Sequence, residues 1–142
     1  MVVVPAPGFV PVEGARRQAY NEVAFRHFLA LEVKRAERSA HPLLLMLVKL
    51  RKPLRNRPEL ATRLTASMFS VLDACVREVD FFGWYCEGTV AAVVFVPGGP
   101  VTDTIRVQLK DRVVGGLQKR LSPDEAAYLQ VRVVEIGRRP WK

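Results

Sequence analysis

Apolar residues recur along this chain with two different spacings, and each spacing predicts a different element. Between residues 15 and 40 they recur every three or four positions, with charged residues on the other side, which predicts an amphipathic helix. From Leu43 to Leu50 almost every residue is apolar, which predicts a short central strand covered on both faces. His41 and Pro42 separate the two elements, because proline lacks a backbone donor and ends a helix.

The rest of the chain predicts a second helix, a β-hairpin, a third helix and a last strand. Pro58 suits the first turn of a helix whose apolar stripe reaches about Val79. Two apolar runs joined by a short turn predict the hairpin, and Thr102 or Asp103 can cap the helix that follows. In chain order we expect helix 58–79, strands 81–85 and 89–96, helix 103–121, a short turn opened by Ser122, and strand 129–136.

Apart from its leading N-terminal helix, the expected order of elements is βαββαβ. This is the order of the ferredoxin-like arrangement, so we predict an α+β fold with an antiparallel sheet and helices packed on one face. The domain is expected to span residues 15–137. Residues 1–14, which contain several prolines and glycines, are expected to form an N-terminal extension or linker, and residues 138–142 a basic tail.

Composition narrows the class of protein and its partners. The chain has 142 residues, of which 49% are hydrophobic and 25% charged, as is typical of one globular domain. Its net charge of +8 favours anionic partners. Cys75 and Cys86 lack the spacing and the neighbouring histidines of a metal site, and no apolar run approaches the ~20 residues that span a bilayer. We therefore expect a cytoplasmic protein without a membrane span, or a part of a longer protein.

Five cations lie around the loop that follows the first predicted strand. They could hold a nucleotide phosphate, RNA or an acidic partner, whereas a solvated loop without a ligand also explains them. No aromatic residue lies between them, which does not favour single-stranded nucleic acid as the main ligand. The cluster consists of Lys49, Arg51, Lys52, Arg55 and Arg57.

The segment from Arg77 to Phe95 carries the most specific pattern of the chain. Arg77-x-x-Asp80 lies a few residues before a short turn between two apolar runs. This segment resembles the signature region of GGDEF domains, the bacterial diguanylate cyclases, in which Arg-x-x-Asp precedes a Gly-Gly-Asp/Glu-Glu-Phe turn. Asn21 and Phe25 also match the family pattern, whereas Glu22 replaces its arginine. In register, the turn positions fall on Cys86, Glu87, Gly88, Thr89 and Val90.

The resemblance implies the nucleotide-cyclase fold without its chemistry. Cyclases of this family bind two metal ions with a carboxylate at the end of the first strand and another in the turn. These two positions fall here on Lys49 and Gly88, and neither residue offers a carboxylate. We therefore expect a degenerate member that is not an enzyme and holds no metal or cofactor. Glu87, a carboxylate displaced by one residue, leaves residual activity open as an alternative.

Arg77 and Asp80 keep their family offset from the turn. The resemblance implies that they can form a site for cyclic di-GMP, in which the guanidinium meets guanine or phosphate and the carboxylate accepts from the guanine edge. The alternative needs no ligand. In that case the arginine is favoured by the dipole at the end of a helix, and the aspartate turns the chain into the following strand.

The sequence thus predicts a non-catalytic GGDEF-like signalling domain of bacterial type that acts as a receptor or a protein-interaction module. Its expected partners are cyclic di-GMP, a second copy of the chain or an adjacent signalling domain. The alternative function is a small basic nucleic-acid-binding domain of ferredoxin-like topology. RNA-binding versions of that topology display aromatic residues on an open sheet face, whereas residues 43–50 and 91–96 are mainly aliphatic.

Overall fold

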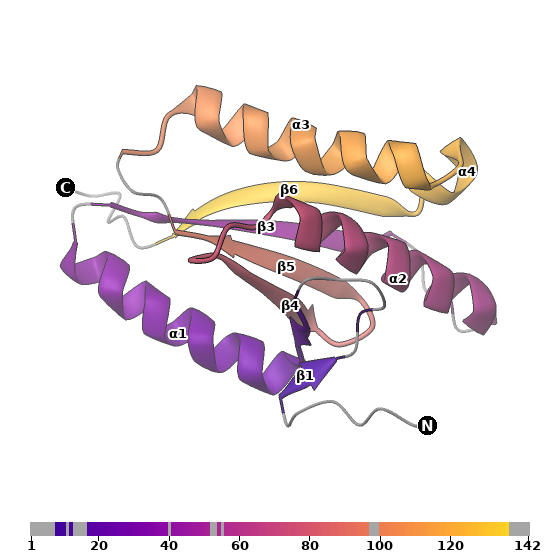
Figure 1. Cartoon of the computed structure of the whole chain (residues 1–142), viewed down its shortest axis with the longest axis horizontal. Helices are drawn as coiled ribbons and strands as arrows, with labels where there is room; N and C mark the ends of the chain where they lie inside the picture. Colours follow the sequence, from indigo (N-terminus) through magenta and orange to yellow (C-terminus); the bar gives the residue numbers. More distant parts are fainter. Residues whose placement is uncertain are drawn as a thin grey trace.

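The computed structural model describes residues 8–10, 12, 17–39, 41–51, 54, 56–96 and 100–136. The residues in these ranges form a six-stranded sheet and four helices. Figure 1 shows α1 on one side of the sheet and α2 and α3 on the other. In chain order the elements are β1 (Phe9–Val10), β2 (Ala19–Tyr20), α1 (Glu22–Arg38), β3 (Leu43–Leu50), α2 (Pro58–Cys75), β4 (Phe81–Cys86), β5 (Val90–Phe95), α3 (Asp103–Arg120), α4 (Pro123–Ala126) and β6 (Leu129–Ile136).

The strands follow the order β1-β2-β4-β5-β3-β6 across the sheet. β3 lies between β5 and β6 and pairs antiparallel with both, and β4 and β5 form an antiparallel hairpin. β2 pairs in parallel with β4, where Tyr20 lies opposite Gly83. The order β4-β5-β3-β6 is that of a ferredoxin-like unit. The predicted α+β fold and the central place of residues 43–50 are therefore confirmed.

Both faces of the sheet are covered, which explains the apolar run of β3. Leu44 and Met46 belong to the core beneath α2 and α3, whereas Leu45 belongs to a second core with Phe25 of α1. Because neighbouring residues of a strand point to opposite faces, a strand between two layers of helices is apolar at almost every position. The two helices of the βαββαβ unit thus share one face, and the leading helix covers the opposite one.

The predicted start of the leading helix is wrong. α1 begins at Glu22 rather than at residue 15, because the Asn21 side chain accepts a hydrogen bond from Ala24 N at 2.9 Å and caps the helix there. Residues 19–20, which the helical spacing included, form β2 instead. Apolar residues keep their helical spacing on both sides of Asn21, so the spacing does not show that the helix begins there. The hydrogen bond of the Asn21 side chain marks the true start.

The predicted end of the second helix is also wrong. α2 ends at Cys75 rather than near Val79, because Val76 adopts an extended backbone conformation. Val79, which the helical spacing placed on the apolar stripe, is 60% exposed. The structure confirms Pro58 as the first residue of α2, Thr102 as the cap of α3 and the predicted bounds of β6. The second hairpin strand begins at Val90 rather than at residue 89, because Thr89 N donates to Cys86 O and so belongs to the turn.

Several sequence-based predictions fall outside the described residues. These are Lys52 and Arg55 of the basic cluster and the tail 138–142. Within the predicted extension 1–14, residues 9–10 form β1, which pairs antiparallel with β2 at the edge of the sheet. In the part of the chain that the structure describes, no helix is long and apolar enough to cross a membrane.

Candidate functional site

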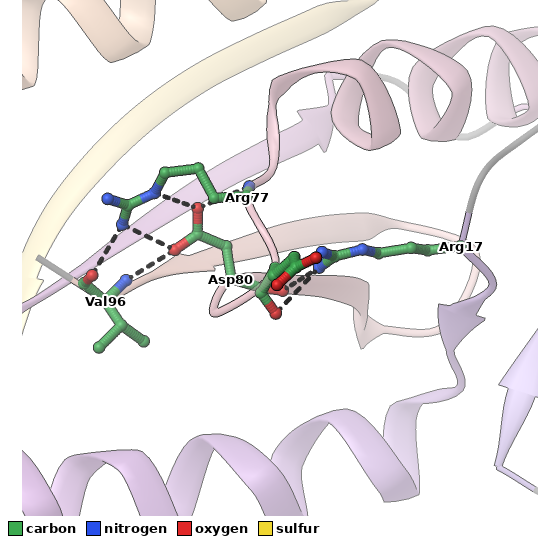
Figure 2. A network of polar contacts seen from close by, with 5 residues as sticks. Arg17, Arg77, Asp80 and Val96 are labelled. Carbon is green, nitrogen blue, oxygen red and sulfur yellow. Dashed lines mark hydrogen bonds and ion pairs between the residues drawn. The ribbon is translucent and has the colours of Figure 1, made fainter.

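Arg77 and Asp80 lie together at the open end of the β4–β5 hairpin (Figure 2). The Asp80 side chain is 0% exposed. Its Oδ2 accepts hydrogen bonds from Arg77 N at 2.9 Å and from Arg77 Nε at 3.0 Å. Its Oδ1 accepts from Arg77 Nη2 at 3.1 Å and from Val96 N at 3.0 Å. The structure therefore brings the two predicted residues together and joins them to the chain that follows β5.

The local backbone explains this arrangement. After α2 the chain makes a turn in which Asp80 N donates to Arg77 O at 3.0 Å. β4 starts at the next residue and pairs with β5 so that Phe81 lies opposite Val94, which returns Val96 to the side of Asp80. Arg77 Nη2 also donates to Val96 O at 2.7 Å. The hydrogen bond with Asp80 raises the pKa of Arg77, so the guanidinium keeps its charge.

The two residues differ in what they can offer a ligand. Asp80 is buried, and each of its carboxylate oxygens already accepts two hydrogen bonds from the chain. The Arg77 side chain is 58% exposed, and its Nη1 has no partner among the described residues. A ligand at this end of the hairpin would therefore contact Arg77, while Asp80 holds the guanidinium in place.

A pocket of about 390 Å³ opens beside Arg77. Leu44, Phe95 and Leu109 give it an apolar lining, and α3 contributes Gln108 as a polar group. Sequence patterns did not indicate the α3 residues of this pocket, because α3 has only a weak amphipathic pattern and two buried residues. The one available signal was the βαββαβ order, which places the helix after the hairpin beside the helix before it.

Arg112 is the second cation of this pocket, and Cys75 also lines it. Burial raises the pKa of the Cys75 thiol, and the charge of the Arg112 guanidinium opposes that shift. Two guanidinium groups, those of Arg77 and Arg112, thus accompany an apolar lining. Such a combination suits an anion that carries a flat apolar part, because the arginines bind the charge and the lining takes the apolar surface.

The described part of the basic cluster lies beside an ion pair of the chain itself. Arg57 donates to the Tyr128 hydroxyl at 3.1 Å, and the neighbouring Arg63 forms an ion pair with Glu125 at 2.5 Å. Together with Arg51 these residues line a hollow of about 600 Å³. Part of the positive charge there is neutralised by the chain itself, which weakens the case for an anion site.

The turn that corresponds in sequence to the GGDEF motif lies at the other end of the hairpin. Lys49 lies opposite Val90, and Gly88 precedes Val90 by two residues, so the two positions at which the resemblance predicts metal ligands lie at the same end of the hairpin. Gly88 has a φ of +77°, and Glu87 is exposed. Glu87 N donates to the Glu22 carboxylate of α1 at 2.6 Å, so an acid of the chain itself occupies a backbone donor of the turn. Among the described residues, no group of three or more His, Cys, Asp and Glu side chains could hold a metal ion.

Comparison with known proteins identifies the fold. No family model matches the sequence, and no curated protein does. The structure is similar to the GGDEF domain of DgcB from Caulobacter crescentus in complex with c-di-GMP, with a TM-score of 0.67 and 13% identity over 99% of this chain and 83% of that one. It is also similar to a DGC protein from Thermotoga maritima, with a TM-score of 0.54 and 16% identity over 82% and 79% of the two chains. The chain therefore has the GGDEF-like nucleotide-cyclase fold that its sequence predicted.

Proposed function

We propose that this chain is a GGDEF-like signalling domain without cyclase activity, which acts as a receptor or a protein-interaction module. The observation that carries the proposal is the pocket beside Arg77, where two guanidinium groups accompany an apolar lining. The positions of the family's metal ligands hold Lys49 and Gly88 instead. A protonated lysine repels a divalent cation, so the charge alignment that nucleotide cyclisation needs is lacking at the turn.

Cyclic di-GMP is the ligand that we propose for this pocket. Its phosphates carry the negative charge that Arg77 and Arg112 can bind, and its guanine rings are flat surfaces for the lining of Phe95 and Leu109. One of the structural neighbours, the DgcB domain, is a complex with c-di-GMP. Because Asp80 is already saturated, we assign it to the placement of Arg77 rather than to the guanine edge.

Titration calorimetry with cyclic di-GMP tests the receptor role. We expect binding at micromolar concentration or tighter, and Arg77→Ala should weaken it by roughly 1.5 to 3 kcal/mol through loss of charge-assisted hydrogen bonds. Addition of Asp80→Ala should then change the affinity little. Arg35→Ala is the matched control, since it removes an equally charged, 76% exposed side chain from α1, far from the pocket in sequence and on the other face of the sheet.

Two results of the same panel would decide against the receptor role. If Arg77→Ala only lowers the melting temperature and the wild-type protein gives neither heat nor a melting shift with cyclic di-GMP, the domain is a protein-interaction module without a nucleotide ligand. Tighter binding of a short RNA than of cyclic di-GMP would favour the nucleic-acid-binding alternative.

Absence of catalysis has its own test. With GTP and either magnesium or manganese, we expect no cyclic di-GMP to form. Glu87 is the exposed carboxylate of the turn, so formation of product that is lost in Glu87→Ala would show that a displaced acid supports catalysis.

A further inference from the structure

Arg17 joins the chain that enters the domain to the turn that carries Arg77 and Asp80 (Figure 2). Its guanidinium Nη1 donates to Asp80 O at 2.8 Å and to Glu78 O at 3.3 Å. Its backbone N donates to the buried carboxylate of Asp73, near the end of α2, at 3.0 Å. One residue at the start of the described domain is therefore held by three acceptors that lie 56 to 63 positions later in the sequence.

The position of Arg17 has a physical reason. The carbonyl groups at the end of a helix carry partial negative charge, and a cation near them is favourable. The last turn of α2 has no basic residue, and the carbonyls that follow it belong to the turn before β4. Arg17, from a distant part of the sequence, donates to two carbonyls of this turn, those of Glu78 and Asp80, and adds a positive charge just beyond the end of α2.

Asp80 is shared between this contact and the pocket. Its backbone carbonyl accepts from Arg17, while its carboxylate accepts from Arg77 and from Val96 N. The residue thus connects three segments, namely the chain before β2, the turn after α2 and the end of β5. A displacement of Arg17 would free the carbonyl of the residue that orients Arg77.

The same segment is also fixed on its other side by close backbone packing. Tyr20 lies opposite Gly83 in the parallel pairing of β2 and β4. A Cβ atom at Gly83 would lie 2.3 Å from Tyr20 O, so only glycine allows this approach. The segment 17–20 therefore has little freedom to move without changing the start of β4.

We infer that Arg17 is a positioning residue for the Arg77 pocket, so that docking of the segment 17–20 and ligand binding at the pocket are coupled. The coupling acts through Asp80, which Arg17 and Arg77 hold from opposite sides. Only the identity of the ligand rests on the proposed function. A ligand that contacts Nη1 of Arg77, which has no partner among the described residues, leaves the bonds to Asp80 in place and stabilises them. Because coupling between two sites is reciprocal, Arg17 and the ligand strengthen each other's contacts by the same factor.

Amide hydrogen exchange without ligand is the first test. The Asp80 carboxylate accepts from Val96 N and Arg77 N, so Arg17→Ala should speed exchange of these two amides by about fivefold to tenfold, the equivalent of one hydrogen bond. Arg17→Lys, which can still donate to the Asp80 carbonyl, should restore most of the protection. Arg26→Ala is the matched control, because Arg26 joins α1 to the distant Tyr85 carbonyl at 2.9 Å and does not contact Asp80.

The same exchange data contain the result that would overturn the coupling. If Arg17→Ala leaves the Val96 and Arg77 amides unchanged, Arg17 does not position the pocket. If the variant speeds all amides equally, including that of Met46 in the centre of β3, Arg17 contributes only to global stability. In either case the inference fails.

Titration with cyclic di-GMP is the second test. Saturating ligand should slow exchange of the Arg17 amide severalfold in the wild-type protein. Arg17→Ala should weaken binding by up to that factor, which is reached when the segment is fully undocked. Binding to Arg17→Ala with wild-type affinity would overturn the coupling. If cyclic di-GMP does not bind to the wild-type protein at all, the proposed ligand is wrong, while the ligand-free exchange experiment still decides the role of Arg17.

Discussion

The two ends of the β4–β5 hairpin are built from the same strands but differ in how they are held. At the turn end, Glu87 and Gly88 are exposed, and α1 holds the turn from outside through Glu22 and Arg26. At the open end, the Asp80 carboxylate is buried and fully hydrogen-bonded. Surface contacts of the first kind contribute little to stability, whereas removal of one partner of a buried charge costs several kcal/mol.

This difference shows which part of the hairpin the fold depends on. The turn contributes few buried atoms, so the strands form with a glycine at position 88 and need no carboxylate there. The open end is different, because Asp80 orders both the turn after α2 and the chain after β5. A turn without a metal-binding carboxylate at one end of the hairpin is therefore compatible with the fold and with the pocket at the other end.

Replacement of the two acids should produce the largest difference between the ends. Asp80→Ala leaves the part-buried amides of Arg77 and Val96 without this acceptor and should lower the free energy of unfolding by about 2 to 3 kcal/mol. Glu87→Ala removes an exposed side chain and should change it by less than ~0.5 kcal/mol. Urea denaturation measures both. Equal midpoints for the two variants would mean that the two ends of the hairpin contribute equally to stability.

Replacement of the two glycines should give the next largest difference. Gly83→Ala places a Cβ atom 2.3 Å from Tyr20 O, which forces β2 away from β4 and should cost about 2 to 3 kcal/mol. Gly88→Ala meets no atom within 4 Å, and only its φ of +77° is unfavourable, at about 1 kcal/mol. The melting temperatures of the two variants show which substitution costs more stability. Gly115→Ala is the control, because a Cβ atom there meets no atom within 4 Å. A larger loss for Gly88→Ala would contradict it.

Cys75 and Cys86 lie at opposite ends of the hairpin, and their thiols should differ in reactivity. Cys75 at the pocket is buried with a raised thiol pKa, whereas Cys86 at the turn is partly exposed. Since the thiolate is the reactive form, Cys86 should react with a maleimide about 10 to 100 times faster. Mass spectrometry of partly labelled protein distinguishes the two sites. Faster labelling of Cys75 would mean that the pocket end opens more readily than the turn.

The raised pKa of Cys75 also predicts a dependence of stability on pH. The folded protein holds the thiol proton more tightly than the unfolded chain does, so this contribution is fully present below the ordinary thiol pKa of about 9.0 and decreases as pH rises through the higher folded value. Relative to Cys75→Ala, the wild-type protein should therefore lose stability above pH ~9. Urea midpoints of both proteins between neutral and alkaline pH measure this, and a constant difference would contradict it.

Loss of the contact between α1 and the turn should have the smallest effect. Glu22→Gln keeps an acceptor for Glu87 N but removes the charge beside Arg26, and should cost about 0.5 kcal/mol or less. High salt should reduce the difference further, because exposed charges are screened. A cost that approaches that of Asp80→Ala would mean that the turn end is as important to the fold as the open end.

Sequence alone determined the order of the elements and the bounds of those with strong local signals. The strands 43–50 and 129–136 were located correctly. The apolar pattern of a strand, and a proline that ends the element before it, are signals that lie within a few residues of each other in the sequence. Pro58 and Thr102 likewise marked helix starts through rules that concern only the first turn. The resemblance of the sequence to GGDEF domains also predicted Lys49 and Gly88 at the positions of metal ligands.

Tertiary structure decided the parts that depend on distant partners. The start of α1 was missed because Tyr20 pairs with Gly83 across the sheet, which local spacing does not reveal. Arg112 joined the pocket only because α3 packs beside α2, and Arg17 reaches an acceptor 63 positions away. Apolar spacing reports which residues are buried, but it contains no information on which buried or polar groups meet. The packing of helices on the sheet brings those partners together, and the pocket is a product of that packing.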